Sequence, residues 1–286
     1  MAVEQQNGYR IFDGHFHVRG IFLPKEGTSP MSLVKYLDKF GIAKAVVTTL
    51  NEGVNLRNAV AALIAAKTPE TADPFTGDIQ NVKLDHTAVK QLVEDYPDRF
   101  VGSYWFNPLD PDEEQAYRDL SIALDDWGFR MVKIQSTFHR GRVPEDIERL
   151  AEYCAERDVP LFVHLSPPIF TFRGVRPLDL IGLAKQYRKL KIILGHFAYT
   201  MEACIESCFA ATIRTNLYLD TSLAVPVGLF SGYKVIGFNR LLYGSDSPAA
   251  GPPSIEMEKV HLLNIPDAEK QAIFYDNMAK LLGIED

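Results

Sequence analysis

The stretch YRIFDGHFHVRG, residues 9–20, is an apolar run of strand type that ends in two histidines one residue apart. We expect it to form the first strand of the fold. A doubly wound open sheet usually carries a glycine-rich G-x-G-x-x-G turn after its first strand. The turn here contains GHFHVRG, which lacks that pattern. The stretch therefore favours a different α/β architecture.

Seven further apolar runs of strand length follow along the chain, at residues 43–50, 99–107, 129–136, 160–166, 191–197, 217–222 and 240–246. Helical patterns separate most of them, at 30–41, 112–128, 144–158, 177–190 and 200–212, and the tail from roughly 254 to 283 indicates further helix. Strand then helix, repeated eight times over about 250 residues, predicts a (β/α)8 TIM barrel, with the doubly wound sheet as the alternative.

Residues 51–98 interrupt this alternation between the second and third strands. They contain two helical patterns, at 55–67 and 83–96. A loop of this length on a compact barrel is usually a lid or a binding element. Because no linker marks a second domain, we expect residues 1–286 to form one barrel domain with a helical segment inserted at 51–98.

The composition excludes several classes of protein. The chain has 286 residues, 47% of them hydrophobic, and a formal charge of −7 with scattered Lys and Arg, so nothing favours a nucleic-acid partner. No apolar run approaches the ~20 residues of a membrane span, and the first residues lack a secretory pattern. Three cysteines indicate a reducing compartment, so we expect a cytoplasmic protein in which Cys204 and Cys208 are reduced thiols packed in a helix.

Polar residues fall late in the predicted strands, inside runs that otherwise exclude charge. They are His15, His17, Lys133, Gln135, His164, His196, Asp220 and Asp246. In a barrel these strand ends converge on one face, and side chains two apart on a strand point the same way. Burying four imidazoles without partners costs several kcal/mol. A shared divalent cation removes that cost, whereas the other three histidines (His86, His139 and His261) are expected to be ordinary core or surface residues.

The motifs DGHFHV, FVHLS, LGHF and LYGSDSP, in that order on strands one, five, six and eight, resemble the amidohydrolase superfamily. They are most similar to its amidohydrolase 2 branch, which includes aminocarboxymuconate semialdehyde decarboxylase, resorcylate decarboxylases and pyrone dicarboxylate lactonase. The resemblance implies that His15, His17, His164 and Asp246 bind one metal ion, with His196 beside it. It also suggests a homodimer.

The metal is expected to be zinc, because the ligands are rich in nitrogen, with manganese or iron as alternatives. Lys133 leaves a further alternative open. In two-metal members of the superfamily a lysine on strand four is carboxylated and bridges the metals, so two metals are a minority possibility. In a one-metal site the same lysine would serve as an ammonium that faces the substrate.

We expect a hydrolase in which a metal-activated water is the nucleophile, Asp246 accepts its proton and His196 assists at the developing oxyanion. The loops after strands four and five contain arginines, which suit carboxylates. The predicted substrate-binding residues are Lys133, Gln135, Arg140, Arg173 and Arg176, and the substrate is a small molecule that carries a carboxylate. Non-oxidative decarboxylation on the same site is the main alternative, and a metal-independent lactonase or a non-catalytic binding barrel are further alternatives.

Overall fold

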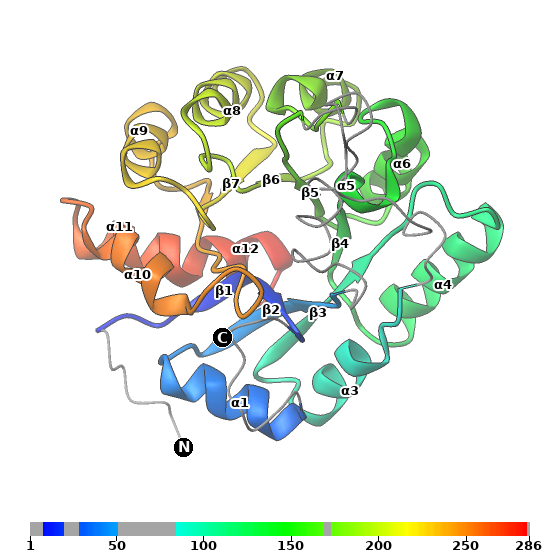
Figure 1. Ribbon diagram of the computed structural model, residues 1–286, viewed down its shortest axis with the longest axis horizontal. Coiled ribbons are helices and arrows are strands. Elements are labelled where there is room, and N and C mark those ends of the chain that lie inside the picture. The colour runs from blue at the N-terminus through cyan, green and yellow to red at the C-terminus, as the bar shows by residue number, and fades with distance from the viewer. Residues whose placement is uncertain (1–7, 20–28, 51–83, 169–172, 285–286) are drawn as a thin grey trace, which may run out of the picture.

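The computed structural model describes residues 8–19, 29–50, 84–168 and 173–284. Eight parallel strands follow one another in chain order around one sheet, and helices surround them (Figure 1). The strands are β1 (Phe12–His17), β2 (Lys44–Thr48), β3 (Phe100–Trp105), β4 (Met131–Ile134), β5 (Leu161–His164), β6 (Ile192–Gly195), β7 (Leu217–Asp220) and β8 (Leu241–Leu242). The predicted TIM barrel is confirmed.

The barrel closes between β1 and the segment that follows β8. Gly14 N donates to Tyr243 O at 2.9 Å, Asp246 N donates to His15 O at 2.8 Å, and His17 N donates to Ser247 O at 2.8 Å. β8 itself contains only two residues. The predicted strand at 240–246 is therefore mostly an extended segment that bonds to β1, and this pairing brings Asp246 next to the two histidines.

The outer helices follow the sequence pattern with two omissions. They are α1 (Pro30–Lys39), α3 (Thr87–Asp95), α4 (Glu113–Asp125), α5 (Ser136–His139), η3 (Glu145–Ile147), α6 (Glu148–Glu156), η4 (Pro177–Asp179), α7 (Leu180–Gln186), α8 (Met201–Ile213), α9 (Pro226–Ile236), α10 (Pro253–His261), α11 (Asp267–Gln271), η5 (Ala272–Asp276) and α12 (Asn277–Leu282). Sequence analysis named no helix at the short α5 or at α9, whose buried residues are Gly228, Leu229 and Gly232. Of the 51–98 segment, α3 accounts for the second helical pattern, and the first lies outside the described residues.

Several helix starts have a local cause in the sequence. Asp112 accepts a hydrogen bond from Gln115 N at 3.0 Å, and Thr200 accepts one from Ala203 N at 3.2 Å. Each side chain thereby satisfies an amide that has no partner within its helix. No helix among the described residues is long and apolar enough to cross a membrane.

The barrel interior is apolar at its N-terminal end and polar at its C-terminal end. The apolar cluster consists of Phe12, Val46, Val101, Met131, Phe162, Ile193 and Leu242 from the strands together with Tyr275, Met278, Ala279, Leu281 and Leu282 from the C-terminal helices. These helices cover the N-terminal opening, so the polar layer at the other end is the accessible one. A second, larger apolar layer lies between the strands and the outer helices.

A register shift in β1 decides which way the two histidines point. The pairing of β1 with β2 is regular at Asp13 and then shifts before Phe16. As a result Phe12 joins the interior cluster at the N-terminal end, whereas Phe16 packs outward among the helices. His15 and His17 then both face the interior at the C-terminal end of the barrel, as predicted from their spacing.

His86 is one of the histidines expected to have a structural role. Its side chain is buried, Nε2 accepts a hydrogen bond from Trp105 N at 3.0 Å, and the ring stacks on Tyr104 with the centroids 4.1 Å apart. Burial lowers the pKa of His86 from 6.5 to about 4. The imidazole is therefore neutral in the folded protein across the range in which it becomes charged in the unfolded chain.

This shift predicts a loss of stability in acid. Between pH 6.5 and 4 the unfolded chain takes up a proton at His86 and the folded protein does not, so His86 alone lowers the free energy of unfolding by about 3 kcal/mol as the pH is lowered. Urea unfolding at a series of pH values measures this slope. His86→Gln keeps an acceptor for Trp105 N and cannot be protonated, so it is expected to flatten the slope. An equally steep loss in the variant would contradict the assignment.

Candidate metal centre

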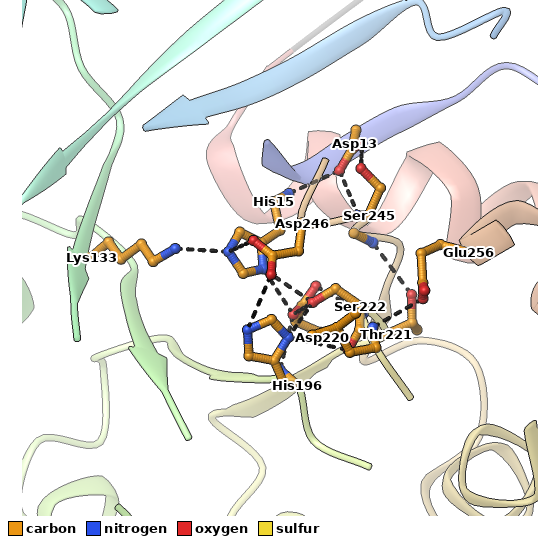
Figure 2. A network of polar contacts seen from close by, with 12 residues as sticks. Asp13, His15, Lys133, His196, Asp220, Thr221, Ser222, Ser245, Asp246 and Glu256 are labelled. Atoms are coloured by element: carbon orange, nitrogen blue, oxygen red, sulfur yellow. Dashed lines mark hydrogen bonds and ion pairs between the residues drawn. The ribbon is translucent and has the colours of Figure 1, made fainter. Parts of the chain in front are cut away.

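Five polar side chains converge at the C-terminal end of the barrel. His15 and His17 come from β1, Lys133 from β4, His196 from the end of β6, and Asp246 from the segment after β8. Figure 2 shows Lys133, His15, Asp246 and His196 joined through one network of polar contacts. Ligand atoms of His15, His196 and Asp246 all lie within 4.8 Å of one another.

The hydrogen bonds of His17 decide its tautomer. Nδ1 lies 3.1 Å from the carbonyl oxygen of Thr49, which can only accept, so Nδ1 carries the proton. Nε2 then carries a lone pair and cannot donate a hydrogen bond. It nevertheless lies 3.0 Å from Asp246 Oδ1, which is also an acceptor. Burial lowers the pKa of His17, so a second proton on the ring does not relieve this contact.

His15 repeats this arrangement beside it. Its Nδ1 lies 3.3 Å from Asp220 Oδ2 and 3.1 Å from Ser222 Oγ, and its Nε2 lies 3.3 Å from Asp246 Oδ1. Burial, followed by the charge of Lys133, lowers the pKa of His15 to about 3. Two neutral imidazoles and a carboxylate thus direct lone pairs into one small space, and a positive species between them makes such an arrangement favourable.

Lys133 supplies one positive charge to this space. Its Nζ lies 2.7 Å from His15 Nε2 and 3.2 Å from His17 Nε2, above the rings of Trp105 and Phe162. Burial lowers the pKa of Lys133 to about 8 although Asp246 and Asp220 oppose the shift. The lysine therefore lies beside the imidazoles of the cluster; sequence analysis assigned it to substrate binding, with a carboxylated metal bridge as the alternative, and both roles stay predictions.

Asp246 and His196 are held in unusual backbone conformations. Their φ angles are +53° and +60°, in the left-handed region that few residues other than glycine adopt. Burial on its own raises the pKa of Asp246, but the surrounding histidines His15, His17 and His196 outweigh it and hold the pKa well below its usual range. Strained backbone at two polar residues of one cluster is typical of a functional site.

The two remaining imidazoles have free nitrogens. His196 Nε2 lies 3.8 Å from Asp246 Oδ2 and has no hydrogen-bond partner within the described part of the chain. His164 packs edge-on against the His196 ring with the centroids 4.7 Å apart, and its Nδ1 likewise has no hydrogen-bond partner among those residues. Burial lowers the pKa of His164 well below 6.5. These unpaired nitrogens, together with Asp246 and the β1 histidines, are a donor set that fits a divalent cation.

A second layer of residues, Asp220 and Ser222, orients the imidazoles, and sequence analysis assigned these two residues no role. Asp220 accepts hydrogen bonds from His196 N at 3.0 Å and from Ser222 Oγ, and Ser222 Oγ lies 2.8 Å from His196 Nδ1. Burial raises the pKa of Asp220, but the hydrogen bonds with His15 and Ser222 reverse the shift, and the group remains a carboxylate. The signal in the sequence was LDTS, in which Asp220 and Ser222 alternate at the end of a strand.

Asp13 and Gly244 also help to position the two histidines of β1. Asp13 accepts hydrogen bonds from His15 N, Ser245 N and Ser245 Oγ in a fully buried position, so it ties β1 to the segment that carries Asp246. Gly244 lies against the second layer, because a Cβ there would come within 2.0 Å of Asp220 Oδ1. Only glycine leaves room for the carboxylate beside His15.

The predicted substrate-binding residues occupy different surroundings. Gln135 is half-buried directly after β4, and Arg140 is half-buried at the end of α5. Arg173 is exposed and pairs with Glu145 at 3.2 Å, and exposed Arg176 pairs with Glu206. The two arginines after β5 are therefore bound to surface acids, and their role in substrate binding stays a prediction.

The chain is a TIM barrel whose polar cluster lies at the C-terminal ends of the strands, where TIM-barrel enzymes have their active sites. The amidohydrolase-2 family model, described as amidohydrolase, matches residues 34–284. The chain therefore belongs to the amidohydrolase family.

Solved structures with this fold cover nearly the whole chain. An uncharacterised TIM-barrel protein from Bordetella bronchiseptica has a TM-score of 0.70 at 16% identity, covering 96% of this chain and 99% of its own. A dihydroxybenzoic acid decarboxylase from Polaromonas, with bound manganese and the inhibitor 2-nitroresorcinol, has a TM-score of 0.64 at 20% identity and covers 97% of both chains. A 4-oxalomesaconate hydratase from Rhodopseudomonas palustris has a TM-score of 0.66 at 14% identity and covers 96% of both. A search of curated protein sequences finds no match.

Proposed function

We propose that the protein is a metal-dependent hydrolase that acts on a small substrate with a carboxylate group. The observation that carries this proposal is the convergence of acceptor atoms: His17 Nε2 and His15 Nε2 face Asp246 Oδ1 at 3.0 and 3.3 Å, and His196 Nε2 is unpaired nearby. His15, His17, His164 and Asp246 would hold one divalent cation. Zinc suits the three nitrogens, with manganese or iron as alternatives.

Each residue of the centre has a task in this proposal. A bound divalent cation would supply a lowered pKa for water and a polarised substrate oxygen. Asp246 has a partly accessible side chain, and its carboxylate can accept a proton from water and return it to a leaving group. His196 Nε2 has a free position for a hydrogen bond with the substrate oxygen on which charge develops. Lys133 offers an ammonium to a substrate carboxylate.

Further unpaired polar atoms line the neighbouring strand ends and support a substrate rich in oxygen. Trp105 Nε1, Ser136 Oγ, Thr137 Oγ1 and His139 Nδ1 are buried and have no hydrogen-bond partner among the residues that the structure describes. Trp105 pairs in register with Lys133, so its ring stands beside the centre. Buried polar groups without partners are costly, and a polar ligand removes that cost. Lys133, Gln135 and Arg140 remain the proposed carboxylate contacts.

Elemental analysis of the purified protein tests the metal. About one zinc or manganese per chain is expected, and the His15→Ala, His17→Ala double variant is expected to lose it. His261→Ala, which removes an imidazole outside the cluster, serves as the matched control and should keep the metal. Two metals per chain would add Lys133, as a carbamate, to the ligands. No metal after loading would overturn the proposal in favour of the metal-independent lactonase or binding barrel.

Non-oxidative decarboxylation is the second candidate. The observation that favours it is the Lys133 ammonium inside the ligand cluster, where it can hold a substrate carboxylate and deliver a proton to carbon. The solved structure of a dihydroxybenzoic acid decarboxylase has the same fold, and this likeness supports the second candidate at the level of the fold. Screening the metal-loaded protein with lactones, amides and hydroxybenzoates separates the two reactions. Hydrolysis releases an acid without carbon dioxide, whereas release of carbon dioxide from a hydroxybenzoate identifies the decarboxylase.

A further inference from the structure

A carboxylate on α10 is buried instead of facing solvent. The side chain of Glu256 is 6% exposed, whereas Glu258 on the same helix is exposed. Glu256 Oε2 accepts a hydrogen bond from Leu223 N at 3.0 Å, and Glu256 Oε1 accepts one from Lys259 Nζ at 2.6 Å. Burial raises the pKa of Glu256, so keeping its charge at this place costs free energy. The two hydrogen bonds offset that cost.

The amide of Leu223 lies in a strained turn after β7. Leu223 has a φ of +56°, in the left-handed region that residues other than glycine rarely adopt. Ala224 N donates to Thr221 O at 3.1 Å and closes the turn. Backbone of this kind persists only where surrounding contacts hold it. The hydrogen bond from Leu223 N to Glu256 is such a contact, and it joins the turn to α10.

The residue directly before Leu223 holds the ring of His196. Ser222 Oγ lies 2.8 Å and Ser222 O lies 3.3 Å from His196 Nδ1. Because both contacts are made to this one ring nitrogen, they fix the direction in which the other nitrogen, Nε2, points. Figure 2 shows Glu256, Ser222 and His196 as members of one polar network. A shift of the turn would therefore move His196 Nε2 relative to Asp246 Oδ2, which lies 3.8 Å away.

An ordinary ion pair on a helix surface does not account for the position of Glu256. Lys259 follows it by three residues, and exposed pairs at this spacing contribute little to stability. Here both side chains are largely buried. Lys259 contacts only Oε1, whereas Oε2 is directed to the turn. The two oxygens thus have separate partners, so the reach of the side chain and its charge can be tested separately.

We propose that Glu256 is a positioning residue for His196. Its carboxylate holds the amide of Leu223, the turn places Ser222, and Ser222 orients the imidazole toward the centre. Glu256 thus acts through the turn and not on the substrate. The expected effect on turnover rests on the proposed function, in which His196 acts on the substrate. The orientation of the ring does not depend on the reaction.

Two conservative substitutions separate reach from charge. Glu256→Gln removes the charge but keeps an oxygen that can accept the Leu223 amide, whereas Glu256→Asp keeps the charge and withdraws it from the turn by one methylene. If Glu256 positions the turn, Glu256→Gln behaves like the wild type and Glu256→Asp does not. A role limited to the ion pair with Lys259 gives the opposite order. Thermal midpoints show that each variant is folded.

The first readout is nitrogen NMR of the histidine side chains in the full-length protein with zinc added. The signal of His196 is identified by its absence from the His196→Gln spectrum. Its Nδ1 resonance is expected to move in Glu256→Asp and to stay in place in Glu256→Gln. Glu258→Asp and Glu258→Gln are the matched controls, because they make the same changes at an exposed position of α10, and they should leave the resonance unchanged.

The second readout is turnover of the substrate that the screen identifies. Glu256→Asp is expected to lower kcat at least roughly 10-fold with KM within about 2-fold, and Glu256→Gln to stay within about 3-fold of the wild type. An unmoved His196 resonance in Glu256→Asp would overturn the proposal, as would impairment of Glu256→Gln alone. A moved resonance with unchanged kcat would confirm the positioning and contradict the role of His196 in the proposed function, so the two failures are distinguishable.

Discussion

Asp246→Asn is expected to lower kcat/KM by about 10³-fold or more while leaving the protein folded. The carboxylate is held in its charged form, contacts His15 and His17, and is the proposed acceptor of the water proton, so the amide loses both metal binding and proton transfer. The measurement is the rate on whichever substrate the screen identifies, together with metal content and far-ultraviolet circular dichroism.

Asp98→Asn provides the control for this prediction. Asp98 is an exposed aspartate just before β3, whereas the centre lies at the other end of the strands. It is expected to retain full activity. If Asp246→Asn also retained wild-type activity, the proposed role of Asp246 would be wrong, and the proton acceptor would have to be sought among the imidazoles.

The largest effect on stability is expected from Asp220→Ala. Removal of this buried carboxylate leaves the amide of His196 without its acceptor and takes one of their hydrogen-bond partners from Ser222 Oγ and His15 Nδ1. Breaking a buried charged network by deleting one partner costs about 3–5 kcal/mol. Urea unfolding measures the loss, and weaker zinc binding should accompany it, because the rings of His15 and His196 lose the group that orients them.

Asp98→Ala makes the same deletion at the surface and is expected to change stability by less than about 0.5 kcal/mol. A loss of that size for Asp220→Ala as well would mean that the second layer does not hold the imidazoles in place. The comparison isolates burial and hydrogen bonding, since the chemical change is identical in the two variants.

The alternation of strands and helices was readable from the chain because each element has its own periodicity. Strands such as KIILGHF are buried on both faces and appear as continuous apolar runs, and helices such as α4 begin at a capping aspartate. α9 was not predicted because small and apolar residues cover both of its faces. β8 was overestimated because the residues after it form an extended segment that bonds to β1 instead of continuing the strand.

The barrel and the resemblance of its motifs to the amidohydrolase family could be predicted from the chain alone, because apolar periodicity and polar residues at strand ends are local properties. The contacts of the folded chain were needed to place Lys133 beside His15 and His17, to show that Asp220 and Ser222 orient the imidazoles, and to pair Arg173 and Arg176 with surface acids. These facts depend on distances between residues that are far apart in the chain, and such distances are set by the closure of the barrel and its packing.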